Sequence, residues 1–163
     1  MFIGHFAVGL AAKSAAPRMS LAVTFAACQL LDLIWPVLVL AGIERVRVDH
    51  DATAFTPLDL EYYPWSHSLG MTLIWSLLVF GLMKVLGRTN VEAVVVALTV
   101  LSHWLLDLLT HRADLPLWFG DGPELGLGLW SSTAGTLLVE LGLFAAGTWL
   151  YVRKTTADNR RGR

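Results

Sequence analysis

The sequence carries little charge and almost no cysteine. Only 15% of its 163 residues are Asp, Glu, Lys or Arg, and the formal net charge is −1 at pH 7. About a quarter of the residues in a typical water-soluble domain are charged, so the low charge argues against that class. Near-neutrality and the lack of a basic stripe with interleaved aromatic residues lead us to expect no nucleic-acid partner. The single cysteine, Cys28, excludes an internal disulfide.

Several familiar catalytic and targeting patterns are also missing from the sequence. There is no Gly-x-Ser-x-Gly motif, which is typical of serine hydrolases of the α/β class. The glycines between positions 120 and 128 do not follow a predicted strand and therefore do not form a phosphate-binding loop. The N-terminus lacks the basic region that opens a signal peptide, so we predict that Met1–Ala12 begins a mature helix.

What the sequence has in abundance is apolar residues in long blocks. Hydrophobic residues make up 55% of the chain and the mean hydropathy is +0.59, so we expect the lipid bilayer to be its solvent. We predict an all-α, polytopic membrane helix bundle over residues 1–153, followed by a basic cytoplasmic tail over residues 154–163. About five membrane segments are expected, and the first is short. They cover residues 1–16, 19–42, 65–87, about 90–111 and about 132–151.

Local signals predict how some of these segments bend and begin. Pro36 should kink the second segment close to Asp32, because proline removes a backbone donor and frees a carbonyl group. Asn90 is a plausible N-cap for the fourth segment, and Ser131 or Ser132 for the last.

The distribution of charge along the chain predicts an orientation in the membrane. Lys and Arg cluster in the connections near residues 13–18 and 84–88 and in the tail, all on one side if the segments alternate. The acid-rich polar connections, 43–64 and 112–130, fall on the other side. By the positive-inside rule the N-terminus is outside and the C-terminus cytoplasmic. We expect an integral protein of a bacterial plasma (inner) membrane.

Ionisable residues inside the predicted segments indicate a polar site. His103, Asp107 and His111 are spaced four apart and therefore share one face of a helix. Such groups are costly in a bilayer, and they usually face a bundle interior and serve a function. His103 and Glu140 lie roughly 12 Å, and Asp32 roughly 15 Å, from the outer ends of their segments. All of them fall in the outer half, as do His5 and His67, so we predict a shared pocket that opens outward.

Imidazole and carboxylate groups together suit a divalent metal, with zinc as the first choice. The predicted metal ligands are three to five of the following: His5, Asp32, His67, His103 and Asp107. A metal of this kind lowers the pKa of a bound water. Glu140 or His111 is then the predicted catalytic base, or a group that orients a ligand. A site close to the outer headgroups suits a lipid or another amphiphilic substrate with an ester or phosphodiester bond.

The order of these short motifs resembles the YdjM-like family of membrane-bound metal-dependent hydrolases. The matching pieces are Gly4-His5, Asp32 with Pro36, Ser66-His67-Ser68 and His103-x-x-x-Asp107. That family is remotely similar to zinc-dependent phospholipases C and single-strand nucleases, so the resemblance implies metal-dependent hydrolysis, with a phosphoester as one candidate substrate. This chain departs from the family at two places. It has Tyr62-Tyr63-Pro64 where His-Arg-Gly is common, and only Asp32 where many members carry two aspartates.

Each of these interpretations has a simpler structural alternative. His103 and Asp107 would then be a hydrogen-bonded pair between helices, His67 an interfacial histidine, and His50, between Asp49 and Asp51, part of a solvated loop. Two other functions also stay open. One is a metal or proton transporter, although the inner half offers few polar groups and no inverted repeat is visible. The other is a non-catalytic membrane scaffold or regulatory protein. The oligomeric state is left open.

Overall fold

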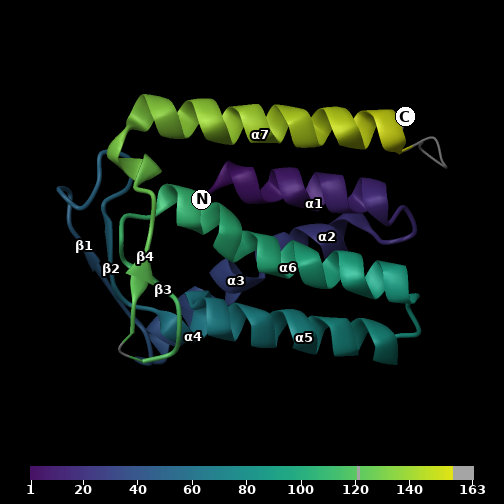
Figure 1. The fold of residues 1–163 in the computed structure, drawn as a ribbon, viewed down its shortest axis with the longest axis horizontal. Coiled ribbons are helices and arrows are strands. Elements are labelled where there is room, and N and C mark those ends of the chain that lie inside the picture. Colours follow the sequence, from purple (N-terminus) through teal and green to yellow (C-terminus); the bar gives the residue numbers. More distant parts are fainter. Residues whose placement is uncertain (121, 156–163) are drawn as a thin grey trace.

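The computed structural model describes residues 1–120 and 122–155 of this protein, and it is mostly helical, as predicted. Its helices are α1 (Ile3–Ala15), α2 (Leu21–Cys28), α3 (Leu30–Leu40), α4 (Pro64–His67), α5 (Leu69–Val85), α6 (Asn90–Thr110) and α7 (Thr133–Lys154). Figure 1 shows α1, α5, α6 and α7 lying side by side, with the short strands gathered across one end. Most of the predicted tail, residues 156–163, lies outside the described residues.

The number of helices that qualify as membrane spans is smaller than predicted. Two, α6 with 21 residues and α7 with 22, are long and apolar enough to cross a bilayer, and the bent pair α2–α3 makes a third if it counts as one span. This composition is compatible with a membrane protein. The prediction of five spans is not supported, because α1 has 13 residues and α5 has 17, whereas about 20 residues are needed to cross the hydrocarbon core.

The break in the second predicted segment lies earlier than Pro36. Helix α2 ends at Cys28, α3 begins at Leu30, and the two axes differ by 54°. Pro36 is accommodated inside α3, so the predicted kink at that residue is misplaced. The break has a consequence for the interior. The Cys28 carbonyl, which would accept the Asp32 N–H in an uninterrupted helix, is available to a side chain.

One of the two predicted helix caps is correct and the other is off by one residue. Ser132 caps α7 by accepting the Gly135 N–H at 3.1 Å. Helix α6 is capped by Thr89, with Asn90 as its first helical residue. Thr89 accepts the Glu92 N–H at 3.2 Å, and the Glu92 carboxylate accepts the Thr89 N–H at 3.0 Å. This reciprocal capping box satisfies two backbone donors at once, which a cap at Asn90 would not do.

The two polar connections contain the strands, which the all-α prediction did not include. In the first, β1 (Arg45–Val48) pairs antiparallel with β2 (Leu58–Tyr62). In the second, β3 (Leu115–Pro116) pairs antiparallel with β4 (Glu124–Leu125), and a 3₁₀ turn (Leu129–Ser131) leads into α7. Leu115 is fully buried in a small core with Tyr63 and Trp104. The connections are therefore ordered ribbons that cover one end of the bundle (Figure 1).

Helices α1 and α7 pack closely through a glycine. A Cβ atom built on Gly147 would lie 2.5 Å from the backbone oxygen and 2.7 Å from the Cα of Ala7. Small residues at such a contact let two helix backbones approach, which is the usual packing mode of helices in membranes. Gly142, one and a half turns earlier on the same helix, has nothing within 4 Å of the equivalent position. The two glycines therefore differ in what surrounds them and not in their secondary structure.

We expect Gly147→Ala to destabilise the protein by about 1–3 kcal/mol, because the new methyl group meets backbone atoms that cannot rotate away. Gly142→Ala is the matched control and should be neutral or slightly stabilising, since alanine favours a helix more than glycine does. Thermal unfolding of the detergent-purified variants measures both effects. Equal melting temperatures for the two variants would contradict the proposed α1–α7 contact.

Candidate metal centre

Two residues of the predicted helical stripe, His103 and Asp107, face the interior of the bundle from α6, whereas His111 follows the end of this helix as its C-cap. His103 is completely buried and Asp107 is 2% exposed. The His103 Nε2 atom lies 3.1 Å from the Oδ2 atom of Asp107, one helical turn further on. Both groups lie towards the end of α6 that carries the ribbons, because this helix ends at Thr110. A fully buried imidazole and carboxylate in an apolar bundle require partners from other elements.

Those partners come from three other helices. From α1, His5 places its Nε2 atom 3.1 Å from Oδ1 of Asp107. From α4, His67 places its Nε2 atom 3.8 Å from Oδ2 of Asp107 and 3.4 Å from Oδ1 of Asp32. Asp32, from the first turn of α3, also lies 3.7 Å from Nε2 of His103. All five predicted metal ligands therefore meet in one cluster, although they are spread over most of the chain.

The spacing within the cluster fits a metal ion. The four atoms Asp32 Oδ1, His67 Nε2, Asp107 Oδ2 and His103 Nε2 form a ring with neighbouring separations of 3.4, 3.8, 3.1 and 3.7 Å. Adjacent donors that bind zinc at about 2.0 Å lie roughly 3.3 Å apart, which is close to these neighbouring separations, but the four atoms do not all lie within 4.8 Å of one another. Two overlapping groups of three residues have donor atoms within 4.8 Å of one another: His5, His103 and Asp107, and Asp32, His67 and His103.

The hydrogen bond of His103 to the backbone leaves its Nε2 atom facing two carboxylates. Its Nδ1 atom lies 2.7 Å from the Cys28 carbonyl at the α2–α3 break, and since a carbonyl only accepts, Nδ1 carries the proton. The Nε2 lone pair of the neutral ring then faces the carboxylates of Asp32 and Asp107. Nε2 is buried and has no hydrogen-bond partner among the described residues. A lone pair held against two carboxylates is repulsive unless a proton or a metal ion lies between them.

The two oxygens of Asp107 have different surroundings. Oδ1 contacts the Met1 amino group and His5. The His5 ring also stacks on that of His103, with centroids 3.7 Å apart. Oδ2 faces only imidazole nitrogens within the described residues. Within the described residues, Oδ2 and Asp32 therefore have histidines as partners and no Lys, Arg or terminal amine.

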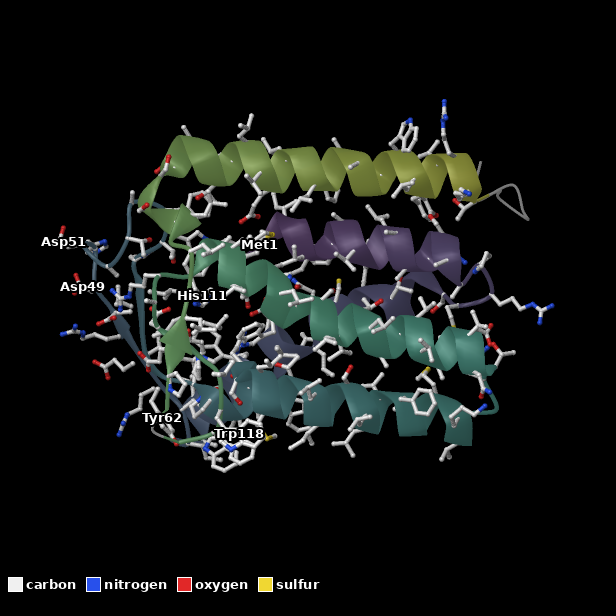
Figure 2. The ribbon with its side chains drawn as sticks, viewed as in Figure 1. Met1, Asp49, Asp51, Tyr62, His111 and Trp118 are labelled. Carbon is white, nitrogen blue, oxygen red and sulfur yellow. The ribbon has the colours of Figure 1, made fainter. Side chains whose placement is uncertain are left out.

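A cavity of about 220 Å³ opens onto the cluster. Asp32, His67, Asp107 and His111 supply its polar wall. The remaining lining is mostly apolar and comes from α3, β2 and the N- and C-terminal parts of the chain: Met1, Phe2, Trp35, Pro36, Leu58, Leu60 and Trp130. A larger cavity, of about 380 Å³, lies against the ribbons and includes none of the five clustered residues. Figure 2 shows Met1 and His111 at the ribbon end of the bundle.

The His111 imidazole lies in the wall of this cavity. Its Nδ1 atom lies 3.0 Å from the Tyr63 hydroxyl and 3.3 Å from Oδ1 of Asp114. Its Nε2 atom lies 4.0 Å from Oδ2 of Asp107, and the ring packs on Trp130 with centroids 4.4 Å apart. With Nδ1 fixed by Tyr63 and Asp114, Nε2 is left to act as an acceptor at the cavity. Neither Tyr63 nor Asp114 was predicted to contact His111, because these contacts join connections whose path periodicity does not encode.

Glu140, the other predicted catalytic residue, is used differently. Its carboxylate accepts the N–H of Ile3 at 2.6 Å, of Phe2 at 3.1 Å and of Gly4 at 3.3 Å. These are the first, otherwise unpaired, donors of α1, and a carboxylate stabilises that end of a helix. Glu140 does not line the cavity. In this position it fixes α1, and therefore His5, against α7.

The β1–β2 ribbon forms a wall of the cavity and is held by ion pairs. Leu58 and Leu60 of β2 line the cavity. Between them, Asp59 pairs with Arg47 of β1 at 2.6 Å and with Arg112, which follows α6. These two guanidinium groups lower the pKa of the Asp59 carboxyl. Asp49 and Asp51 lie at the outer edge of this ribbon in Figure 2, away from His111.

Comparison with known proteins adds no assignment: no family model, curated protein or solved structure matches this chain. The resemblance of its short motifs to the YdjM-like family therefore stays a prediction from sequence. The arrangement of side chains has to support the functional interpretation by itself.

We expect the Asp59 ion pairs to stabilise the protein above about pH 4 and to be lost at lower pH. A carboxyl whose pKa is lower in the folded state contributes stability above its unfolded pKa, near 3.9, and loses it as the pH falls through the folded value. The difference in melting temperature between wild type and Asp59→Asn should be constant from pH 5 to 8 and shrink below pH 4. A difference that grows on acidification would contradict this assignment.

Proposed function

We propose that this protein is a membrane-embedded, metal-dependent hydrolase that acts on a lipid or another amphiphilic ester or phosphodiester. The observation that carries the proposal is the cluster on α1, α3, α4 and α6, whose carboxylates and imidazole nitrogens converge beside a largely apolar cavity. Polar groups of this density inside an apolar bundle are costly and usually functional.

Four side chains would hold the metal. Asp32, His67, His103 and Asp107 surround the part of the cluster that no Lys, Arg or terminal amine reaches within the described residues. Their mixed nitrogen and oxygen donors suit zinc best. His5 would then hold Asp107 through Oδ1, at 3.1 Å, or serve as a further ligand. A divalent ion in this place lowers the pKa of a coordinated water and polarises an ester or phosphoryl oxygen.

The remaining residues would supply proton transfer and substrate binding. His111 would accept a proton at Nε2, while the Tyr63 hydroxyl and Asp114 keep its Nδ1 atom protonated. The apolar side chains of Trp35, Leu60 and Trp130 would contact the hydrocarbon part of an amphiphilic substrate. The scissile bond would then lie towards the His/Asp wall of the cavity.

The proposal includes a finer membrane arrangement. The short helices α1 and α5 and the bent pair α2–α3 would accompany α6 and α7, giving five membrane segments of unequal length. The end of the bundle opposite the ribbons carries Lys13 and Lys84 in the last turns of α1 and α5, and Arg18 and Arg88 in the connections that follow. This favours a cytoplasmic location for that end. The cluster would then lie towards the outer face of a bacterial plasma membrane, with the N-terminus outside. The resemblance to the YdjM-like family of membrane-bound hydrolases also favours a membrane location.

We expect detergent-purified wild-type protein to contain close to one zinc or other divalent transition metal per chain. His103→Ala and Asp107→Asn should lose most of it, because each removes a donor from the ring. His50→Ala is the matched control, since His50 is exposed in the β1–β2 connection and should leave the metal content unchanged. Elemental mass spectrometry measures the content, and size-exclusion chromatography shows that the variants stay folded.

A wild-type protein that is free of metal and does not bind added zinc would overturn the metal proposal. The cluster would then be a structural hydrogen-bond network, and a non-catalytic scaffold would be the better interpretation. A protein that binds metal and carries it across vesicle membranes without hydrolysing any lipid ester would indicate a transporter.

We also expect His111→Ala to separate metal binding from hydrolysis. The metal content should stay at the wild-type level, because Nε2 of His111 lies outside the four-atom ring. Hydrolysis of lipid esters or phosphodiesters should fall by about 10²–10⁴-fold in kcat, which is the usual contribution of a general base. Loss of metal with loss of activity would instead make His111 a ligand, and unchanged kcat would exclude it as the base.

A further inference from the structure

We propose that Glu44 is a positioning residue for the metal centre, acting through Ser66 on His67. This inference rests on the proposed metal-binding function, but it concerns a residue that the sequence left among the acids of a polar connection. Glu44 is 1% exposed, and Ser66 is fully buried. A buried carboxylate outside the cluster needs its own explanation, because burial of an unpaired charge is costly.

The three side chains form a continuous chain of hydrogen bonds. The Glu44 carboxylate accepts the Ser66 N–H at 2.8 Å and the Ser66 hydroxyl at 2.7 Å. The Ser66 Oγ atom lies 2.7 Å from Nδ1 of His67. Nε2 of the same imidazole faces Asp32 and Asp107. The chain therefore runs from a buried carboxylate, through one hydroxyl, to the far side of a proposed metal ligand.

The direction of these bonds fixes the proton on His67. A serine hydroxyl has one hydrogen to donate, and the charged Glu44 oxygen at 2.7 Å is a better acceptor than the Tyr63 carbonyl at 3.3 Å. With its hydrogen given to Glu44, Oγ can only accept from His67, so Nδ1 carries the proton. The Nε2 lone pair is then free to bind a metal. Groups that orient ligating histidines in this way typically change metal affinity by 10–100-fold.

The fold delivers Glu44 to this place through the end of α3. Gly42 adopts a positive φ of 72°, and the N–H groups of Gly42 and Ile43 bond to the carbonyls of Val39 and Leu38 at 3.0 and 2.9 Å. This is a Schellman cap, in which glycine reverses the chain at a helix end. The reversal turns Glu44 back towards α4. The same short helix thus supplies Asp32 from its first turn and Glu44 just after its last.

The test compares two substitutions with opposite effects on the hydrogen-bond chain. Glu44→Gln keeps the shape but introduces an amide N–H₂, which donates to Ser66 Oγ and turns the hydroxyl hydrogen towards His67. The imidazole then carries its proton on Nε2, where it blocks metal binding. Ser66→Ala only removes the hydrogen bond. Glu61→Gln is the control, since Glu61 is on β2, is exposed and pairs with Arg47.

Zinc affinity, measured by calorimetric titration of each metal-stripped variant, should fall at least 10-fold in Ser66→Ala and further in Glu44→Gln. It should stay unchanged in Glu61→Gln. The d–d absorption of the Co²⁺-loaded protein should shift in both Ser66→Ala and Glu44→Gln. A general loss of stability does not produce such a shift. Wild-type affinity and spectrum in both variants would overturn the role of Glu44 while leaving the metal centre intact.

A second measurement separates this inference from the proposed function. The ¹⁵N side-chain shifts of His67 in the metal-free wild type should report a proton on Nδ1, and those in Glu44→Gln a proton on Nε2. If the wild type binds no metal but shows this reversal, the hydrolase proposal fails and the positioning by Glu44 stands. If His67 shows the same tautomer in both proteins, the positioning by Glu44 is wrong.

Discussion

The contact between imidazole lone pairs and carboxylates inside the bundle is the constraint on which the structure depends. His103 keeps one proton on the side of the Cys28 carbonyl, so its Nε2 atom faces Asp32 and Asp107 and requires a second proton or a metal ion between them. Burying charged groups without compensation costs on the order of several kcal/mol per ion. A second proton on His103, or the metal ion proposed above, would remove this conflict. The groups involved come from α1, α3, α4 and α6.

The break between α2 and α3 and the start of α1 supply backbone groups that position side chains of the cluster. The α2–α3 break exposes the carbonyl that orients His103, and it also turns Asp32 into the site. Glu140 satisfies the unpaired donors at the start of α1, which places His5. Polar groups at helix ends have no partner within the helix. In an apolar solvent they have to find one in the protein, so helix ends and buried side chains satisfy one another.

One of the ribbons forms part of the cavity wall beside the cluster. The ribbons cover one end of the bundle (Figure 1), and β2 contributes Leu58 and Leu60 to the cavity beside the polar wall. The Arg47–Asp59–Arg112 ion pairs join this wall to the chain after α6. An apolar cavity with one polar side suits an amphiphilic molecule, which has an apolar part and a polar part. The proposed substrate class follows from that match between the wall and the cluster.

The sequence by itself determined the helical class and the polar face of α6, because hydropathy and the spacing of His103 and Asp107 are local properties. It also indicated which ionisable groups share a depth, and all five predicted ligands meet in the structure. Only the tertiary structure decided that Glu44 reaches Ser66, that Glu140 binds the start of α1, and that the second segment breaks at Gln29. These depend on contacts between residues far apart in the chain, which periodicity does not encode. Helix lengths below about 20 residues likewise corrected the count of spans.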